Sequence, residues 1–374
     1  MKPPVVVLAG VRWDFLWQRH QTMATRFADA GYPTVFVETT GLANPRPGKA
    51  TLRKVLARIR RVLVKNERPP AKNPTVYAPI TAPPTLRAFV WANERFLVPR
   101  VLRDLRKMVD ARPVVVAYPP TWTTLDLISG LDARLVLYDC SDDYERFPRA
   151  PRDIAKSEQE LLLRADLISC TSEYLLEKAR RVRPDAFPSG PAVDYDRFAV
   201  LQDQPLGKDI KTVCFFGDAT RERMDFEAFE AIVSAGFELR LVGGLDDTGK
   251  KLSEMPGVDY AGEVCHAELP GALASVDSFV LPYRINALTR AISPAKTYEC
   301  LAAGRPVVAA PIPAMERLGE YIYLARRPED YVRILRSLWD TGTEAKVRGG
   351  IQLARENSWD ARFRELEEAI WRVL

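Results

Sequence analysis

The sequence has few of the residues that build metal centres and no apolar stretch long enough to cross a membrane. Its 374 residues include only two histidines, His20 and His266, which excludes a histidine-rich metal site. Its five cysteines are scattered without metal-ligand spacing, which predicts reduced thiols in a cytosolic chain. No uncharged apolar window reaches the length of about 18 residues that a spanning helix needs. The short apolar run 5–9 therefore predicts a buried strand and not a secretion signal.

The remaining composition is that of a folded protein of mixed helices and strands. Hydrophobic residues make up 47% of the chain, charged residues 28%, and the net charge is +5. This balance excludes disordered, collagen-like and disulfide-scaffold chains. At about 150 residues per domain, the length allows two domains, each with its own core.

Short apolar runs alternate with helical patterns along the whole chain. The runs are continuous, which is typical of parallel strands covered on both faces. The predicted strands are 5–9, 34–38, 114–118, 134–138 and 167–171, followed by 212–216, 238–242, 258–261, 278–282 and 306–309. We therefore predict an α/β chain with two doubly wound, Rossmann-like sheets that face a central cleft, where ligands bind at the carboxyl ends of the strands.

The pattern restarts after a polar, aperiodic segment, which predicts the domain boundaries. We expect a first domain over 1–194, a linker over 195–211, and a second domain over 212–357. Residues 358–374 have apolar side chains at helical spacing. They predict a C-terminal helix that packs back on the first domain.

A helix in the second domain has the features of a phosphate site. Ser293 followed by Pro294 predicts the start of this helix, and Gly304 predicts its end. Free N–H groups and a partial positive charge at a helix N-terminus favour phosphate. Lys296 lies in the first turn, and Glu299 follows one turn later, where a carboxylate can accept hydrogen bonds from ribose hydroxyls.

Two arginines nearby extend this candidate site. Arg284 and Arg290 precede the helix and add positive charge. The alternative interpretation is a capped helix that carries a Lys–Glu pair on its surface.

The stretch 283–309 resembles the nucleotide-sugar signature of the GT-B glycosyltransferases. Residues 17–21 (Trp-Gln-Arg-His-Gln) and 163–168 resemble further elements of this family, and 260–263 with His266 resembles its loop for the donor base. The resemblance covers the chain except roughly 41–107. It is closest to bacterial group 1 transferases of exopolysaccharide and cell-surface glycan assembly, and more distantly to the glucuronosyltransferase of xanthan assembly.

The resemblance implies a metal-independent Leloir transferase with a nucleotide-sugar donor, most simply a UDP-sugar, and no cofactor. Two glutamates eight positions apart are usual in retaining members, yet here only Glu299 matches and Ala291 takes the other place. The implied donor-binding residues are Gly217, Arg221, Arg223, Glu263, Tyr283, Arg284, Arg290, Ser293, Lys296 and Glu299.

Acidic residues crowd the end of the predicted strand 134–138. Neighbouring carboxylates raise each other's pKa, which suits a general base. Asp142 also lies where the resembling xanthan enzyme has its proposed base, so Asp142 is the first candidate and Asp143 the second. Asp139 is interpreted as orienting the loop. The alternative is a turn and capping cluster without catalytic function.

The loops after the first strand of each domain are expected to line the ligands. Gly217 allows a close backbone approach, and Arg221 or Arg223 can clamp a diphosphate. Gly10, Arg12 and Trp13 are expected on the acceptor side, and the loop lacks a dinucleotide-binding glycine pattern. His20 is interpreted as a packing or hydrogen-bonding residue and not as a base.

Residues 51–108 carry 14 lysines and arginines against three acidic residues. The stretches 51–65 and 86–108 combine these cations with apolar residues at helical spacing, which is typical of helices on an anionic membrane surface. The alternatives are packing on the first domain with a solvated basic face, or nucleic-acid binding, which no recognised module supports.

The sequence therefore predicts an inverting glycosyltransferase that uses a lipid-linked or glycan acceptor in cell-surface polysaccharide synthesis. We expect it in the cytoplasm, peripheral at the inner face of the plasma membrane. Two rival hypotheses are an epimerase or hydrolase of nucleotide sugars with the same fold, and an inactive nucleotide-sugar-binding scaffold.

Overall fold

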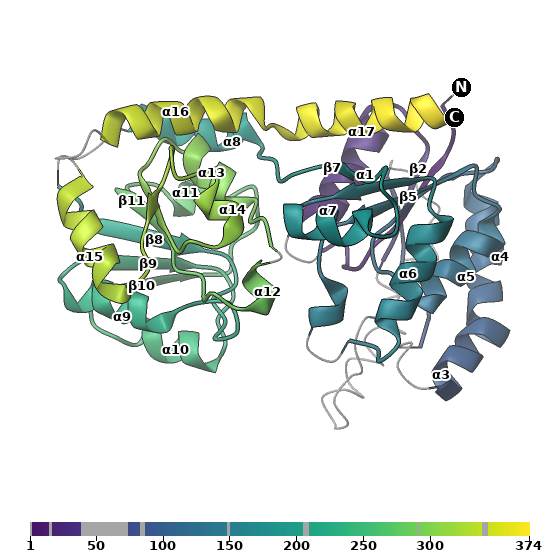
Figure 1. The fold of residues 1–374 in the computed structure, drawn as a ribbon, viewed down its shortest axis with the longest axis horizontal. Helices are drawn as coiled ribbons and strands as arrows, with labels where there is room; N and C mark the ends of the chain where they lie inside the picture. Colours follow the sequence, from purple (N-terminus) through teal and green to yellow (C-terminus); the bar gives the residue numbers. More distant parts are fainter. Residues whose placement is uncertain are drawn as a thin grey trace. The chain divides into compact units, whose positions relative to one another are not determined.

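The computed structural model describes residues 2–14, 17–38, 74–82, 87–147, 150–204, 209–290, 292–338 and 343–374. The chain forms two compact units (Figure 1). The first comprises Met1–Ser189 and Phe363–Leu374, and the second comprises Gly190–Arg362. The basic stretch predicted over 51–65 lies outside the described residues.

The first unit contains a seven-stranded parallel sheet with the order β3-β2-β1-β4-β5-β6-β7. Its strands are β1 (Val5–Leu8), β2 (Thr34–Val37), β3 (Thr75–Tyr77), β4 (Val114–Ala117), β5 (Leu135–Cys140), β6 (Leu167–Cys170) and β7 (Phe187–Pro188). Strands β1, β2, β4 and β5 are buried along their whole length, as continuous apolar runs predict.

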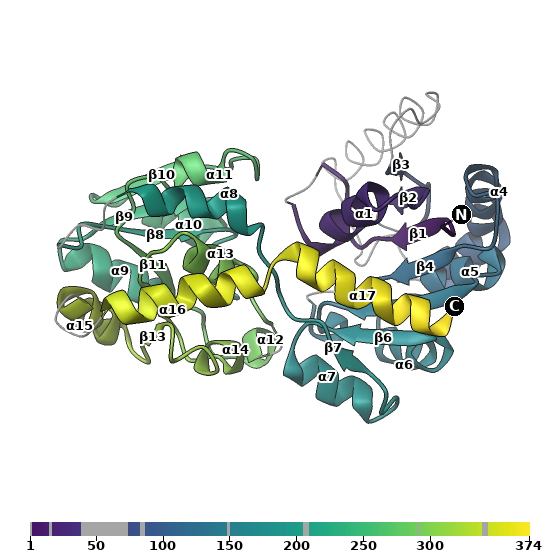
Figure 2. The ribbon, with the colours of Figure 1, turned by 90° about the horizontal axis from the view of Figure 1, so that it is seen from above.

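Helices cover both faces of this sheet. They are α1 (Arg19–Asp29), α3 (Arg87–Ala92), the π-helix η1 (Asn93–Leu97), α4 (Val98–Met108), α5 (Trp122–Leu131), the 3₁₀ turn η2 (Tyr144–Arg146), α6 (Ile154–Arg164), α7 (Glu173–Arg180) and most of α17 (Trp359–Val373). Helices α1 and α17 lie over one face, and α5 and α6 lie over the other (Figures 1 and 2).

The C-terminal helix is held on the first unit by aromatic and charged contacts. The ring of Phe363 packs edge-on against Phe27 at 5.0 Å between centroids. Glu367 accepts hydrogen bonds from Tyr32 Oη at 2.6 Å and from Lys2 Nζ at 2.9 Å. The last helix is therefore built into the core of the first unit, since Phe363, Leu366 and Ile370 are buried.

The second unit contains a six-stranded parallel sheet with the order β10-β9-β8-β11-β12-β13. Its strands are β8 (Thr212–Phe216), β9 (Glu238–Val242), β10 (Val258–Gly262), β11 (Ser278–Leu281), β12 (Val307–Ala309) and β13 (Tyr323–Leu324). Its helices are α8 (Tyr195–Ala199), the 3₁₀ turn η3 (Val200–Asp203), α9 (Phe226–Ser234), α10 (Asp247–Ser253), α11 (Leu269–Ala272), α12 (Ala287–Arg290), α13 (Lys296–Ala302), α14 (Pro313–Glu316), α15 (Pro328–Ser337) and α16 (Thr343–Glu356).

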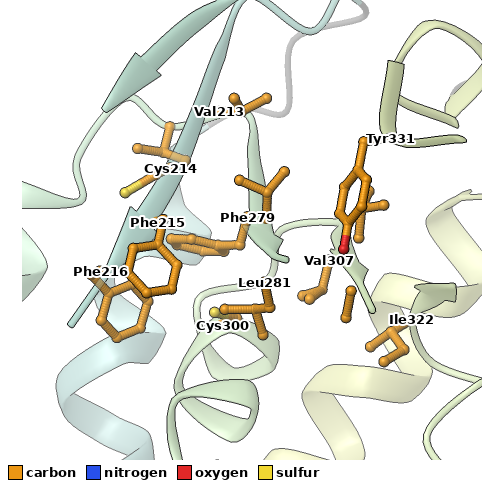
Figure 3. Packing of buried hydrophobic residues seen from close by; sticks show 14 of the residues in the cluster. Val213, Cys214, Phe215, Phe216, Phe279, Leu281, Cys300, Val307, Ile322 and Tyr331 are labelled. Atoms are coloured by element: carbon orange, nitrogen blue, oxygen red, sulfur yellow. The ribbon is translucent and has the colours of Figure 1, made fainter. Parts of the chain in front are cut away.

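Apolar packing fixes α13 against this sheet. Cys300 of α13 lies beside Leu281 of β11, and both are fully buried (Figure 3). Gly304 ends the helix with φ +66°, a conformation that favours glycine. The buried guanidinium of Arg305 then donates to the carbonyls of Val276 and Leu201, each at 2.9 Å.

The linker expected over 195–211 needs correction. Residues 195–203 form α8 and η3, and Phe198 and Leu201 are buried in the core of the second unit. The segment is too short to show a helical repeat in sequence, so its two buried apolar residues were not recognised as a core face.

Two further expectations concern thiols and membrane spans. All five cysteines are free thiols, as predicted. Among the described residues, no helix combines the length and the apolar character needed to cross a bilayer.

Candidate active site

Two glycines, Gly217 and Gly243, directly follow the carboxyl ends of β8 and β9. Gly217 has φ +108° and Gly243 has φ +124°, both in the region that favours glycine. A Cβ at Gly243 would lie 2.6 Å from the carbonyl oxygen of Gly217. A Cβ at Gly217 would lie 2.1 Å from Lys296 Nζ. Side chains are therefore excluded from the edge where ligands of such sheets bind.

Lys296 places its ammonium group at this edge. Its Nζ donates to the carbonyl oxygen of Phe216 at 2.8 Å and lies 4.6 Å above the ring centroid of Phe215. Burial lowers the pKa of Lys296 to about 8, although the charge of Glu299 acts in the opposite direction. Within the described residues, no carboxylate forms an ion pair with Lys296. The site thus holds an ammonium group next to a backbone carbonyl.

The start of α13 differs from the prediction. The helix begins at Lys296, its N-cap residue is Ala295 in helical conformation, and no side chain caps it. Ser293 is therefore not the N-cap. The N–H of Thr297 donates to the carbonyl of Pro294 at 3.1 Å, so a tight turn precedes the regular helix. Because a residue before proline avoids the helical region, Ser293 remains outside the helix.

The four arginines predicted to bind the donor differ in burial and in their contacts. Arg223 is half-buried and lies close enough to Lys296 to contribute to lowering its pKa. Arg284 is exposed and donates from Nη1 to the carbonyl of Arg221 at 3.2 Å. Arg221 and Arg290 are exposed too. Arg223 is therefore the arginine that the fold brings to the lysine.

The two predicted donor-binding residues Tyr283 and Glu263 differ in their exposure to solvent. Tyr283 is buried in the core and forms a backbone bridge with Met224, which makes it a packing residue. Burial raises its pKa. Glu263 is exposed, and a Cβ at Gly244 would lie 3.5 Å from its Oε1 and 2.6 Å from Asp218 Oδ1. Ala291 lies outside the described residues.

In the first unit, Asp139 is fully buried at the end of β5. It accepts hydrogen bonds from Arg19 Nε and from Ser169 Oγ, each at 2.7 Å. Arg19 Nη2 also donates to Ser189 Oγ at 2.6 Å. Asp139 therefore ties β5 to α1 and to β6, and the orienting function expected for it stays a prediction.

Asp143 also forms part of a buried cluster of ion pairs. Its carboxylate pairs with Lys178 Nζ at 2.9 Å, and the same ammonium pairs with Glu158 at 2.8 Å. Burial lowers the pKa of Lys178, but the two carboxylates outweigh it, so that the pKa is raised. Asp142 is more exposed than Asp139 and Asp143, and it accepts a hydrogen bond from Ser141 Oγ at 3.3 Å. Asp142 and Asp143 thus differ in burial, and the assignment of either as the base stays a prediction.

The loop after β1 meets His20 where the strand order of the first sheet reverses. The N–H of Gly10 donates to His20 Nδ1 at 3.1 Å, and the imidazole stacks on Tyr118 at 3.7 Å between centroids. Burial lowers the pKa of His20 to about 3; Asp139 opposes this shift and Arg19 adds to it. His20 is therefore neutral with its proton on Nε2, a hydrogen-bonding and packing residue.

The other two residues expected on the acceptor side differ in burial. Trp13 is half-buried, its backbone N–H donates to Glu38 Oε1 at 3.2 Å, and its ring packs edge-on against Phe36. Arg12 is exposed and lies 4.0 Å from Asp14. Trp13 is thus part of the loop's packing, whereas Arg12 remains at the surface.

Sequence reasoning missed the cations that neutralise the acidic loop, Arg19 and Lys178. Arg19 lies in the singled-out element 17–21, but only the fold shows that its side chain is buried. The described residues contain no group of three or more His, Cys, Asp or Glu side chains arranged to hold a metal ion.

The second unit matches a known family in sequence. Residues 210–341 match the model of the group 1 glycosyl transferases. TuaH of Bacillus subtilis strain 168, named as a candidate teichuronic acid biosynthesis glycosyltransferase, is 26% identical over 262 residues. The match covers 62% of this chain and 65% of TuaH, slightly less than two thirds of that relative.

Solved structures resemble the chain over its whole length. HepE (Alr3699) of Anabaena, solved with UDP and glucose, has a TM-score of 0.67 at 14% identity and covers 99% of both chains. A variant of S. aureus TarM, solved with fondaparinux, α-GlcNAc-glycerol and UDP, has a TM-score of 0.64 at 9% identity and covers 98% of this chain and 99% of its own. The two parallel Rossmann-like sheets, these full-length structural matches and the group 1 match confirm the resemblance predicted from the sequence: the chain has the fold of the GT-B glycosyltransferases, and its second unit carries their group 1 signature.

Proposed function

We propose that the protein is a Leloir-type glycosyltransferase of cell-surface polysaccharide synthesis that uses a UDP-sugar. The observation that carries the proposal is the position of Lys296 against Gly217, at the carboxyl end of β8 and inside the segment that matches group 1. The UDP bound in HepE and TarM supports the choice of nucleotide, and the name of TuaH supports the choice of pathway.

The second unit would stabilise the leaving diphosphate with side chains and without a metal ion. Lys296 and Arg223 supply positive charge where negative charge develops, and Gly217 lets the phosphates approach the backbone. Preorganised groups of this kind are worth about 2.7–4 kcal/mol each in other enzymes.

The first unit would supply the base. Asp142 takes the proton of an acceptor hydroxyl, the oxygen attacks the anomeric carbon, and the bond from that carbon to the diphosphate breaks as UDP leaves with the electron pair. A direct displacement of this kind inverts the anomeric configuration. Asp139 and Asp143 hold the loop through Arg19 and Lys178.

Calorimetric titration with UDP, GDP, ADP and NAD, each with and without EDTA, tests the donor site. We expect UDP to bind most tightly and its affinity to be unchanged by EDTA. A strong preference for GDP or ADP would replace the donor in this proposal. Loss of UDP binding in EDTA would refute metal independence, and binding of NAD alone would refute a nucleotide-sugar site.

We further propose that the surface of α3, η1 and α4 contacts an anionic membrane that carries a lipid-linked acceptor. Trp91 and Phe96 are 59% and 58% exposed, and their rings touch at 5.4 Å between centroids. Exposed cations lie along the same helices, together with the exposed Glu94: Arg87, Arg95, Arg100, Arg103, Arg106 and Lys107. Aromatic rings together with cations are typical of surfaces that bind the interface of anionic lipids.

Flotation with vesicles of phosphatidylglycerol or phosphatidylcholine tests this surface. We expect binding to phosphatidylglycerol that weakens with salt and with Trp91→Ser/Phe96→Ser. Equal binding of the double variant and the unmodified protein would refute the contribution of this surface.

A further inference from the structure

Glu299 is the last member of a chain of polar side chains in the second unit. Asp194 pairs with Arg197 Nη2 at 3.1 Å. Arg197 Nη1 in turn contacts His266 Nδ1, and His266 Nε2 lies 3.6 Å from Glu299 Oε1. Three separate segments thus converge on this carboxylate: the start of α8, the loop after β10, and α13.

The contact with Arg197 determines which nitrogen of His266 carries the proton. A guanidinium donates hydrogen bonds and accepts none, so Nδ1 is the acceptor. Nε2, which faces Glu299, therefore carries a proton and can donate it to the carboxylate. The separation of 3.6 Å is too long for a good hydrogen bond, but it lies within ion-pair range and can shorten when a ligand closes the site.

Glu299 has the features of a hydrogen-bond acceptor that is available to a ligand. Its side chain is only 16% exposed, and in the described part of the chain His266 is the polar side chain that meets its carboxylate. A hydrogen-bond donor at Oε1 restrains the rotation of this flexible side chain. The second oxygen thereby remains available to accept hydrogen bonds from hydroxyl groups.

We propose that His266, held by Arg197, is a positioning residue that directs Glu299 toward the ribose hydroxyls of the bound nucleotide. The inference rests on the proposed function, because it concerns the same donor site. It adds a determinant outside the donor helix: the orientation of Glu299 depends on α8 and on the loop after β10.

Titration with UDP and with 2′,3′-dideoxy-UDP separates positioning from packing. We expect His266→Ala to weaken UDP binding about fivefold, the value of one hydrogen bond, and to leave dideoxy-UDP binding unchanged. Arg197→Met should act in the same direction. Glu299→Ala should weaken UDP at least as much, and adding His266→Ala to it should cause no further loss, since both act through one carboxylate.

Two controls keep the result specific. Cys265→Ser changes an exposed neighbour in the same loop and should bind both nucleotides as the unmodified protein does. His266→Gln places an amide donor near the position of Nε2 and should restore most of the UDP affinity. Thermal unfolding of each variant verifies that the unit is folded.

The possible failures are distinguishable. If His266→Ala weakens UDP and dideoxy-UDP equally, the imidazole supports the loop by packing, for example against Phe198, and the positioning proposal is wrong. If the unmodified protein binds no nucleotide at all, the proposed function itself is wrong, and this inference is refuted with it.

Discussion

Two buried carboxylates of the first unit and one lysine of the second unit lie in different electrostatic environments. In the first, Asp139 and Asp143 are buried and each pairs with a cation, Arg19 or Lys178, within 3 Å. In the second, the Lys296 ammonium lies against a backbone carbonyl, and burial lowers its pKa. Burying a charge is costly for folding unless the group is paired or hydrogen-bonded. The buried pairs of the first unit indicate architecture, whereas a lysine with a lowered pKa at a strand edge is a candidate for ligand binding.

The largest effect is expected at Asp142. Asp142→Asn should lower the rate of sugar transfer about 10²–10⁴-fold, because an amide cannot take the acceptor proton. UDP affinity should not change, since the donor groups lie in the second unit. The assay is UDP release from a UDP-sugar with membrane lipid extract as the acceptor source. Full activity of this variant would exclude Asp142 as the base, and donor breakdown without acceptor would favour a hydrolase or epimerase.

Asp139→Asn should instead destabilise the first unit. It leaves the buried Arg19 guanidinium without its counter-charge, which typically costs about 3–5 kcal/mol. Urea unfolding followed by circular dichroism measures the loss. Asp132→Asn is the matched control, because Asp132 pairs with Arg112 on the surface and such pairs are worth at most about 1 kcal/mol. Equal stability of the two variants would contradict an architectural function of the buried pair.

Lys296 should make UDP binding dependent on pH. Its pKa of about 8 rises when a diphosphate binds, so affinity is full below pH 8 and falls by up to about tenfold per pH unit above it. Lys296→Ala should abolish this dependence and weaken UDP about 10–100-fold. Calorimetry between pH 7 and 9.5, in two buffers with different ionisation enthalpies, measures both effects. A flat profile for the unmodified protein would exclude Lys296 as the phosphate ligand.

The same shift has the opposite sign for stability. The pKa of Lys296 in the folded protein lies below the usual lysine value of 10.5, so the unfolded chain binds this proton more tightly. The contribution of Lys296 to the free energy of unfolding therefore rises as the pH increases from about 8 toward 10.5, while UDP affinity falls.

Gly217→Ala should have the smallest effect of the four. Alanine at φ +108° is strained, and its Cβ would displace Lys296 Nζ, so we expect a loss of stability of about 1 kcal/mol and weaker UDP binding. Gly271→Ala is the control, since a Cβ there meets open space. Thermal unfolding and UDP titration provide the measurements, and unchanged UDP affinity would show that the approach of Lys296 to Gly217 is not needed.

Strands that are buried on both faces were predictable to within a residue or two. Strands β8 and β9 have the predicted bounds. In β8 the last four residues are buried, because a continuous apolar run forms where both faces of a strand are covered. The short strands β3, β7 and β13 were missed, since two or three residues carry no periodic signal. Residues 195–203 were taken for a linker for the same reason.

The residues of the candidate site were likewise predictable from the sequence only where their signals are local. Gly217, Lys296 and Glu299 stand out in sequence, because a strand end and a helix start are local features with local signals. The predicted N-cap at Ser293 is wrong by two residues, since a tight turn after Pro294 precedes the helix and its N-cap is Ala295.

The sequence by itself thus determined the longer strands of both sheets, the C-terminal helix and the glycine and lysine of the donor edge. Only the tertiary structure decided which charges pair. Arg19 and Asp139 are 120 positions apart, Arg197 and His266 are 69 apart, and Lys178 and Asp143 are 35 apart. Such partners meet only after the strands have assembled, because a local pattern carries no record of which distant side chain will share its side of the sheet.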